Sequence, residues 1–538
     1  MKKNTQVAVA ADASSVLKLM AATFSNANKA VLELVQNGRR AGARRIEIVA
    51  TETALTVSDD GSGIDDFGNL LAIAKSGWNE AIQQEESPYG AGFISALFAA
   101  EHLSVSSRGK TMQGKTVDII ANLACPIVSD PKAPKKGTIV TLERPISAFN
   151  MNVLRGTLRG FPIPVVINGE EIERAHAKDD QFQSTEVGDI RLCLSNRHWT
   201  AYLQGMRIAS FPEGHFYPDQ NVTVVHLDPQ RFKGRMPDRD NLVDHLSQTQ
   251  VIATAIQSLA KQQLAGMRAE MSAEEFAEQF NLLSSWGCSS LLNDLDVLPS
   301  SILTQYKDLP TYGRPWDYGT DVANGVSRVR GQLPACVCGD AEEASWIVRT
   351  YACALKLPMI NLNVLDEGHW AHQDIQIIDL DNSLEGDNIV HLDDDAIEVI
   401  GEVIARGEMP GLTYAWVDEV RVLKSITLKG PLGEVTLNPH WGLFKSGGIL
   451  DITPASSSEV LLQTSDYMDD DRFDEDAFDE DERVFDQNQR VLVSGDGAEL
   501  IRATLRNDCP LVHIKGKQFL VTIDESESVS VEEVPKAA

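Results

Sequence analysis

A series of short glycine-rich or polar segments, set between apolar stretches in residues 28–138, constrains the fold of this chain most. The first segment belongs to a predicted helix, ANKAVLELVQNGRR, whose apolar side chains between 30 and 35 form one face and which Gly42 can end. Glu33 and Asn37 are four residues apart, about 40° around a helix, and therefore share a face. A carboxylate beside a carboxamide can activate a water and offer a neutral oxygen to Mg²⁺, although most such pairs only cover a solvent-facing helix.

The second segment, DDGSGI, follows a strand-like ALTVS. Asp59 can accept a hydrogen bond from an exocyclic amine such as that of adenine. Gly61 and Gly63 allow the backbone to approach a flat ligand closely. Taken alone, the segment is more typical of a plain Asp-Gly turn.

Three further segments complete the series. NLLAIAKSGWNEA places Asn69 and Lys75 on a short predicted helix. SPYGAGFISALFAAEHLSVSS places Gly90 and Gly92 directly before an apolar helix, where free N–H groups and the positive end of the helix dipole can meet phosphates. Lys-Gly-Thr138 opens a predicted strand, TIVTLE.

In this order the segments resemble the GHKL ATPases, the Bergerat-fold superfamily of gyrase-type topoisomerases, MutL, sensor histidine kinases and ninety-kilodalton heat-shock chaperones. IAKSG and GAGFISALFAAEHLSV are most similar to the chaperones, whereas DDGSGI is closer to the form in MutL and the topoisomerases. The resemblance covers about residues 25–145.

The resemblance implies ATP and Mg²⁺ as cofactors and assigns roles to matching positions. Glu33 matches the general base and Asn37 the magnesium ligand. Asp59 matches the carboxylate that reads adenine. The other matching positions would contact the nucleotide: Gly61 and Gly63 beside the base, Asn69 and Lys75 on the lid side, Gly90, Ala91, Gly92 and Phe93 around the phosphates, and Thr138 near Asp59.

Two departures from the family pattern bear on hydrolysis. The family usually has Asp three residues after the magnesium Asn, where this chain has Arg40, and the Gly-Gln of the chaperones before the phosphate loop is Ser87-Pro88. The first departure affects the surroundings of the metal and the second the lid hinge. We therefore expect ATP binding with slow hydrolysis.

A second domain would follow the nucleotide domain, since residues 146–265 contain several strand patterns and then an amphipathic helix at about 244–264. In most GHKL ATPases other than the kinases, such a domain contributes a cation to the terminal phosphate, and ATP closes two protomers into a clamp. Lys233 and Arg235 in the loop DPQRFKGRMPDRDNL are the candidates, and could stabilise charge on the transferred phosphoryl group. The alternative is a solvated basic loop.

Charge limits the possible partners. With 48 basic and 78 acidic residues, the net charge is −30, so the molecule as a whole repels nucleic acid and anionic membranes. Arg39, Arg40, Arg44 and Arg45 form a basic cluster in the sequence that could contact a phosphate backbone, or could be scattered surface arginines. Residues 466–486 are strongly acidic and could fold back onto this cluster as a nucleic-acid mimic.

The predicted fold class is α/β (α+β), with an N-terminal Bergerat-fold sandwich, a transducer-like second domain and a mixed C-terminal region. The predicted parts are the ATP-binding domain at 1–145, the transducer-like domain at 146–265, a mixed region at 266–460, a disordered acidic linker at 461–490 and a strand-rich tail at 491–538. The seven cysteines do not describe a disulfide scaffold. The longest apolar run, residues 91–100, is too short for a bilayer span, and we expect a cytoplasmic protein.

Other motifs predict less. Glu367, His369, His372 and Asp374 imitate a metal cluster but are more typical of a polar surface loop. The predicted function is a slowly hydrolysing Mg-ATPase that acts as an ATP-gated, homodimeric, chaperone-like clamp on a protein client. The alternatives are a MutL- or topoisomerase-like ATPase acting on DNA, and a nucleotide-gated binding module with little turnover.

Overall fold

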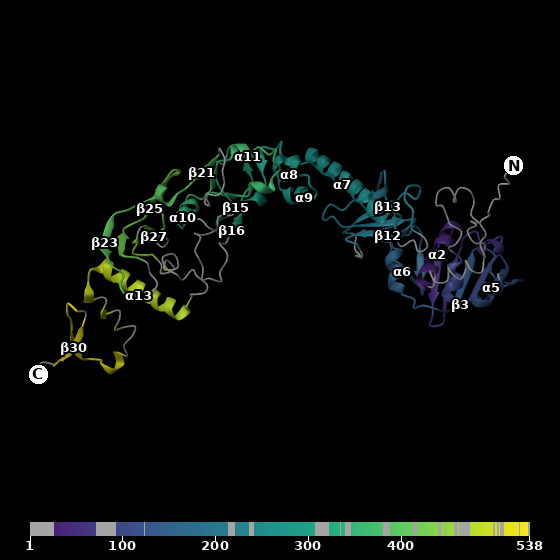
Figure 1. Cartoon of the computed structure of the whole chain (residues 1–538), viewed down its shortest axis with the longest axis horizontal. Helices are drawn as coiled ribbons and strands as arrows, with labels where there is room; N and C mark the ends of the chain where they lie inside the picture. The colour runs from purple at the N-terminus through teal and green to yellow at the C-terminus, as the bar shows by residue number, and fades with distance from the viewer. Residues whose placement is uncertain are drawn as a thin grey trace, which may run out of the picture. The chain divides into compact units, whose positions relative to one another are not determined.

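The protein is described from a computed structural model and divides into two compact units. The first comprises Met1–Ala269 and Leu282–Cys288, and the second comprises Glu270–Asn281 and Ser289–Ala538 (Figure 1). The structure describes residues 26–71, 93–122, 124–213, 221–235, 241–306, 322–333, 335–338, 346–379, 388–412, 417–438, 443–446, 448–456, 461, 474–498, 501–502, 505, 511–526 and 528–535.

The first unit contains an eight-stranded sheet in the order β5-β4-β3-β6-β2-β1-β7-β8. Neighbouring strands are antiparallel, except that β1 and β7 run parallel. The strands are β1 (Ile46–Ala50), β2 (Ala54–Asp59), β3 (Ala100–Ser107), β4 (Lys110–Lys115), β5 (Ile127–Ser129), β6 (Thr138–Pro145), β7 (Val165–Ile167) and β8 (Glu170–Glu171).

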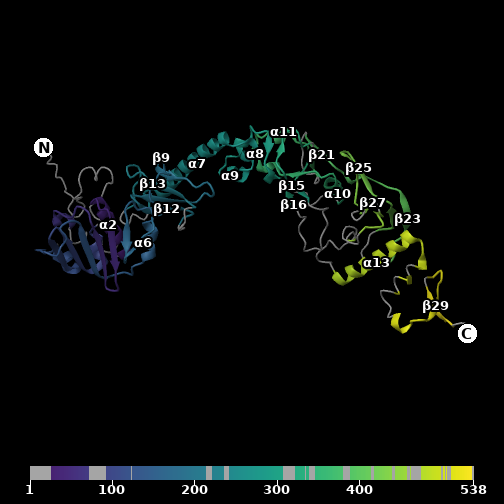
Figure 2. The same cartoon turned by 180° about the vertical axis from the view of Figure 1, so that it is seen from behind.

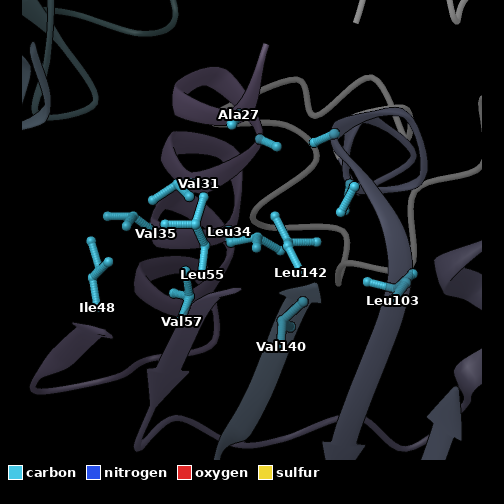
Figure 3. Packing of buried hydrophobic residues seen from close by; sticks show 14 of the residues in the cluster. Ala27, Val31, Leu34, Val35, Ile48, Leu55, Val57, Leu103, Val140 and Leu142 are labelled. Atoms are coloured by element: carbon cyan, nitrogen blue, oxygen red, sulfur yellow. The ribbon is translucent and has the colours of Figure 1, made fainter. Parts of the chain in front are cut away.

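Helix α2 (Ala27–Arg40) covers this sheet. The Asn26 side chain caps it by accepting hydrogen bonds from the N–H groups of Asn28 and Lys29. Figure 3 shows its apolar face packed against side chains of β1, β2 and β6. Each fully buried Val or Leu in such a core stabilises the fold by roughly 1.5–3 kcal/mol. Among the described residues of this unit, the chain also forms the shorter helices α4 (Ser95–Ala99), α5 (Thr116–Asn122) and α6 (Met151–Thr157).

The first sheet extends further along the sequence than predicted. Strand β7 pairs with β1, β8 pairs with β7, and Leu154 of α6 lies in the same hydrophobic core. Strands β7 and β8, which follow the predicted boundary at 145, thus complete one edge of the same sheet.

A second, five-stranded sheet of the first unit has the order β12-β11-β13-β10-β9 (Figure 2). Its strands are β9 (Gln183–Thr185), β10 (Gly188–Arg191), β11 (Trp199–Leu203), β12 (Met206–Phe211) and β13 (Thr223–Leu227). Helix α7 (His245–Glu270) follows, so the predicted order of strands and then an amphipathic helix is confirmed.

The described residues of the second unit form five further small sheets. The six-stranded one, β16-β15-β19-β18-β20-β21, has four parallel strands, from β19 to β21. The strands of this unit are β14 (Val297–Leu298), β15 (Leu303–Tyr306), β16 (Val322–Asn324), β17 (Arg328–Val329), β18 (Cys336–Cys338), β19 (Met359–Ile360), β20 (Ile377–Asp379), β21 (Ile389–His391), β22 (Glu398–Ile400), β23 (Val403–Gly407), β24 (Glu419–Leu423), β25 (Thr427–Gly430), β26 (Gly433–Thr436), β27 (Leu443–Ser446), β28 (Ile449–Ile452), β29 (Gln518–Ile523) and β30 (Val529–Val534).

After α7 the chain forms two short helices, α8 (Ala273–Ala277) and α9 (Phe280–Ser285). Further along the chain lie α10 (Trp346–Ala354) and α11 (Ala371–Asp374). Within the described parts of the chain, none of the helices is long and apolar enough to cross a membrane.

The acidic segment differs most from its prediction. Its second half forms helix α13 (Glu475–Ser494), where a disordered linker was predicted. Phe478 and Phe485, seven residues apart on one face, are buried against a core that includes Val420 and Ile452, while most of the acidic side chains occupy other faces. The helix ends at Gly495, whose positive φ of 61° suits a C-terminal cap, so the predicted strand-rich tail begins with the last turn of a helix. The hairpin of the tail lies further on, between β29 and β30.

Candidate functional site

Asp59 and Thr138 lie opposite each other in the first sheet. They are paired residues of β2 and β6, at the end of one strand and the start of the other. Asp59 Oδ1 accepts a hydrogen bond from the Gly61 N–H at 2.8 Å. Burial raises the pKa of Asp59, and the Gly61 hydrogen bond opposes part of that rise. The arrangement is a partly desolvated carboxylate beside a hydroxyl, which suits a neutral amine donor.

The loop after Asp59 is held from two sides. Ser107 Oγ accepts from the Ile64 N–H at 3.0 Å and donates to the Gly137 carbonyl at 2.7 Å, so one buried hydroxyl connects the loop to the start of β6. Gly63 has a φ of 79°, and a Cβ there would lie 2.9 Å from Ser107 Oγ. The glycine at position 63 is thus required by the local backbone of the structure.

Helix α2 lies directly over Asp59. A Cβ added to Gly38 would be 3.1 Å from Asp59 Cβ, so backbone and carboxylate stem are in close contact. Glu33 and Asn37 lie on this helix, and both side chains are half-buried. The Glu33 oxygen Oε2 is buried. The structure therefore places the acid–amide pair on the element that covers Asp59.

Arg40 interacts with the predicted metal ligand. Its Nη1 donates to Asn37 Oδ1 at 3.3 Å, and the side chain is 8% exposed. Asn37 Oδ1 thus already faces a cation. In the part of the chain that the structure describes, no carboxylate cluster arranged to hold a metal surrounds this carboxamide oxygen. Such an oxygen fits a Mg²⁺ ion that arrives with the phosphates of a nucleotide, and Asn37 would hold it. Bound there, the ion would neutralise phosphate charge.

The lid side of the predicted site is only partly described. Asn69 is half-buried in a short 3-10 helix, Phe67–Leu70, where its N–H donates to the Asp66 carbonyl at 3.3 Å. Phe93 packs against the core of the first sheet. Four predicted contacts and the hinge departure lie outside the described residues: Lys75, Gly90, Ala91, Gly92 and Ser87-Pro88.

Lys233 and Arg235 lie in a loop closed by a bridge between Gly234 and Leu242. The Lys233 ammonium is half-buried and donates to the Pro229 carbonyl at 2.6 Å. Arg235 is exposed, and its backbone N–H donates to the Asn241 carbonyl. In this structure the lysine is directed into its own loop, so its predicted contact with a terminal phosphate would require it to reorient.

The four arginines near the end of α2 do not share one surface. Arg40 is buried, whereas Arg44 and Arg45 are exposed. The backbone N–H groups of Arg44 and Arg45 both donate to Asp60 Oδ1, at 2.7 and 3.1 Å, and these bonds lower the pKa of Asp60. The interpretation of all four as a basic patch is therefore wrong for Arg40.

Three side chains near the site were not singled out from the sequence: Ser107, Asp60 and Arg108. Arg108 donates to the Ser62 carbonyl from Nε and Nη2 and pairs with Asp65, which anchors the glycine loop to the turn after β3. Asp60 could have been noticed as the second acid of DDGSGI. Ser107 and Arg108 carry no local signal, because their partners lie far away along the chain.

The second unit contains His369 and His372, which the sequence analysis considered as part of a possible metal cluster. His369 is buried and not on a surface loop as predicted; its Nδ1 accepts from the Ala371 N–H. Burial lowers the pKa of His369 to about 4. Among the residues that the structure describes, no group of three or more His, Cys, Asp or Glu side chains is arranged to hold a metal ion.

Comparison with known proteins matches residues 24–132 to a family described as histidine kinase-, DNA gyrase B-, and HSP90-like ATPase. The segment contains α2, the glycine loop and strands β1 to β5 of the sheet, so this part of the chain is a GHKL-type ATPase domain. The chain is a mixed α/β protein in which that domain is followed by further mixed sheets. The match does not single out the heat-shock chaperones. No curated protein is significantly similar to the chain.

Proposed function

We propose that the protein is a slowly hydrolysing Mg-ATPase whose first unit uses ATP to control its own conformation. The observation that supports this most is the position of Asp59, opposite Thr138 and beneath the helix that carries Glu33 and Asn37. Most of this arrangement lies in the GHKL-type segment, and domains of this type bind and hydrolyse ATP.

In this proposal Asp59 accepts a hydrogen bond from the exocyclic amine of adenine. Thr138 lies opposite Asp59 at the same end of the sheet. Gly61 orients the carboxylate through its N–H and Gly63 shapes the loop beside the base. Asn69, Lys75 and the backbone from Gly90 to Phe93 would surround the triphosphate. Glu33 would take a proton from the attacking water, which is the step that separates an ATPase from a simple nucleotide binder.

The second sheet supports a proposed use of ATP binding, the closure of a clamp. Its strands and the long helix α7 follow the ATPase domain in the order in which GHKL clamps carry their transducer, and Lys233 or Arg235 would reach the terminal phosphate after rearrangement. We propose a homodimeric, cytoplasmic clamp acting on a protein client. The burial of Arg40 reduces the basic surface available to DNA, which favours a protein partner.

The contact between Arg40 and Asn37 favours a second candidate, a nucleotide-gated binding module with little turnover. A cation beside the metal-ligand oxygen disfavours a second cation there. The two candidates differ in one measurable quantity, the rate of phosphate release relative to the occupancy by ATP.

The Glu33→Ala variant tests the proposed function. ATP affinity measured by calorimetry is expected to stay within about threefold of wild type, whereas phosphate release falls by about a hundredfold or more, the size of a lost general base. Glu47→Ala, at an exposed position of β1, is the matched control and should leave both unchanged. Equal phosphate release by wild type and Glu33→Ala would remove Glu33 from the reaction. ATP binding without phosphate release in wild type would favour the binding module.

A further inference from the structure

Arg40 connects the two sheets of the first unit. It lies in the last turn of α2, and its guanidinium bridges two oxygens: Nη1 donates to Asn37 Oδ1 and Nη2 donates to Gln204 Oε1, each at 3.3 Å. Gln204 Oε1 also accepts from Gln36 Nε2 at 2.9 Å. A side chain of the second sheet therefore shares its acceptor oxygen between two residues of the helix that carries the predicted metal ligand.

Gln204 lies in a tight turn between two strands of the second sheet. Gln204 lies between β11 and β12 with a φ of 53°, followed by Gly205 with a φ of 82°. A Cβ at Gly205 would lie 2.6 Å from Pro162 Cδ and 3.0 Å from Phe161 Cδ2, so this turn packs tightly on the segment that precedes β7. A displacement of Gln204 relative to α2 would therefore involve the hairpin and not one side chain alone.

We propose that Arg40 is a positioning residue whose hydrogen bond to Asn37 Oδ1 competes with the binding of Mg²⁺ to that oxygen. When Mg²⁺ replaces Arg40 there, the contact between Arg40 and Gln204 of the second sheet changes as well. This inference rests on the proposed function, because it concerns the metal that would accompany ATP. It adds a regulatory role for a residue that departs from the family pattern.

Electrostatics gives the direction of the effect. A guanidinium and a divalent cation cannot both lie against one carboxamide oxygen, because two positive charges within about 4 Å repel strongly in a partly desolvated site. Binding of the metal would break the Arg40–Asn37 hydrogen bond and displace the guanidinium, so that Gln204 Oε1 loses Arg40 as a donor while Gln36 remains. Because the two cations compete, a change in the strength of the Arg40–Asn37 hydrogen bond changes the Mg²⁺ concentration that half-saturates ATP binding by the same factor.

The test is the Mg²⁺ concentration that half-saturates ATP binding, measured by calorimetry on the full chain. Arg40→Met keeps an unbranched side chain and removes the competing donor. We expect the half-saturating concentration to fall about tenfold, the size of one charged hydrogen bond. Arg39→Met is the matched control, since it removes the same charge one residue away, and should shift the value less than twofold. Equal shifts in the two variants, or none in Arg40→Met, would overturn the proposal.

A second variant tests the proposal in case the Arg40→Met protein does not fold. Gln204→Asn tolerates the positive φ and shortens the side chain by one methylene, so Arg40 loses the partner that holds it near Asn37. We expect a fall in the half-saturating Mg²⁺ concentration smaller than that of Arg40→Met, and an unchanged value would overturn the proposal. If wild type binds no ATP at any Mg²⁺ concentration, the proposed function itself fails; if it binds and the variants behave like wild type, only the role of Arg40 fails.

Discussion

The two sides of the candidate site are held in place by different means. On the sheet side, Asp59, Thr138 and the glycine loop are fixed by main-chain pairing and by the buried Ser107 hydroxyl. On the helix side, the Asn37 side chain is held by a contact of 3.3 Å from Arg40. The side assigned to adenine is therefore defined by the backbone, whereas the side assigned to the metal depends on side chains that can exchange partners.

This difference suggests a division of work. A purine needs the same donors and acceptors in every state, which a strand ladder provides. A metal and a triphosphate arrive and leave, and a side-chain contact can be broken for them at the cost of a single hydrogen bond, about 1.5 kcal/mol. Substitutions on each side of the site test whether the two sides differ in this way.

Gly137→Ala tests the sheet side. The residue has a φ of 83°, and a Cβ would lie 2.0 Å from the Asp59 carbonyl oxygen. We expect a loss of stability of about 3 kcal/mol or more in the first unit, measured as urea unfolding of the full chain, because backbone atoms must move.

Gly109→Ala is the matched control for Gly137→Ala. Gly109 has a similar φ of 73°, but a Cβ there meets nothing within 4 Å. The cost should be only the conformational one, about 1 kcal/mol. Equal losses in the two variants would show that close contact at Asp59 does not define the sheet side.

Asn37→Ala tests the helix side. The lost contact is a single hydrogen bond of 3.3 Å on a half-buried side chain, and Ala is the better helix former. We expect the free energy of unfolding in urea to change by less than about 1 kcal/mol. A loss as large as that of Gly137→Ala would contradict the view that the helix side is adjustable.

Asp59→Asn tests the electrostatics of the sheet side. Because burial raises the pKa of Asp59, the folded state binds the proton more tightly than the unfolded state, and the ionised carboxylate costs stability once the pH exceeds the folded pKa. A neutral carboxamide at this position carries no such cost, and its oxygen can still accept from the Gly61 N–H. We expect the variant to be as stable as wild type or more stable at pH 7, with the advantage shrinking as the pH falls toward about 4. A variant whose stability relative to wild type does not rise between these two pH values would contradict the raised pKa.

The sequence predicted the parts of the site that have a local pattern. Apolar spacing predicted α2, and strand and glycine patterns predicted Asp59 at the end of one strand and Thr138 at the start of another. Gln204 could not be predicted, because its contact with Arg40 spans 164 residues.

Helix α13 shows why composition misled. The net negative charge of the acidic segment suggested disorder, yet Phe478 and Phe485 are spaced so that one helical face can be buried while most carboxylates remain on other faces. The edge formed by β7 escaped prediction for a related reason, since its partner β1 lies far earlier in the chain. Pairings between distant segments are set by tertiary packing and leave no periodic signal.

The most direct test of the account is calorimetric titration of ATP, with Mg²⁺ present, into wild type and Asp59→Asn in parallel. The account predicts saturable binding to wild type and affinity weaker by about tenfold to a hundredfold in a folded Asp59→Asn protein. No heat with wild type, or equal affinity in the two proteins, would contradict it.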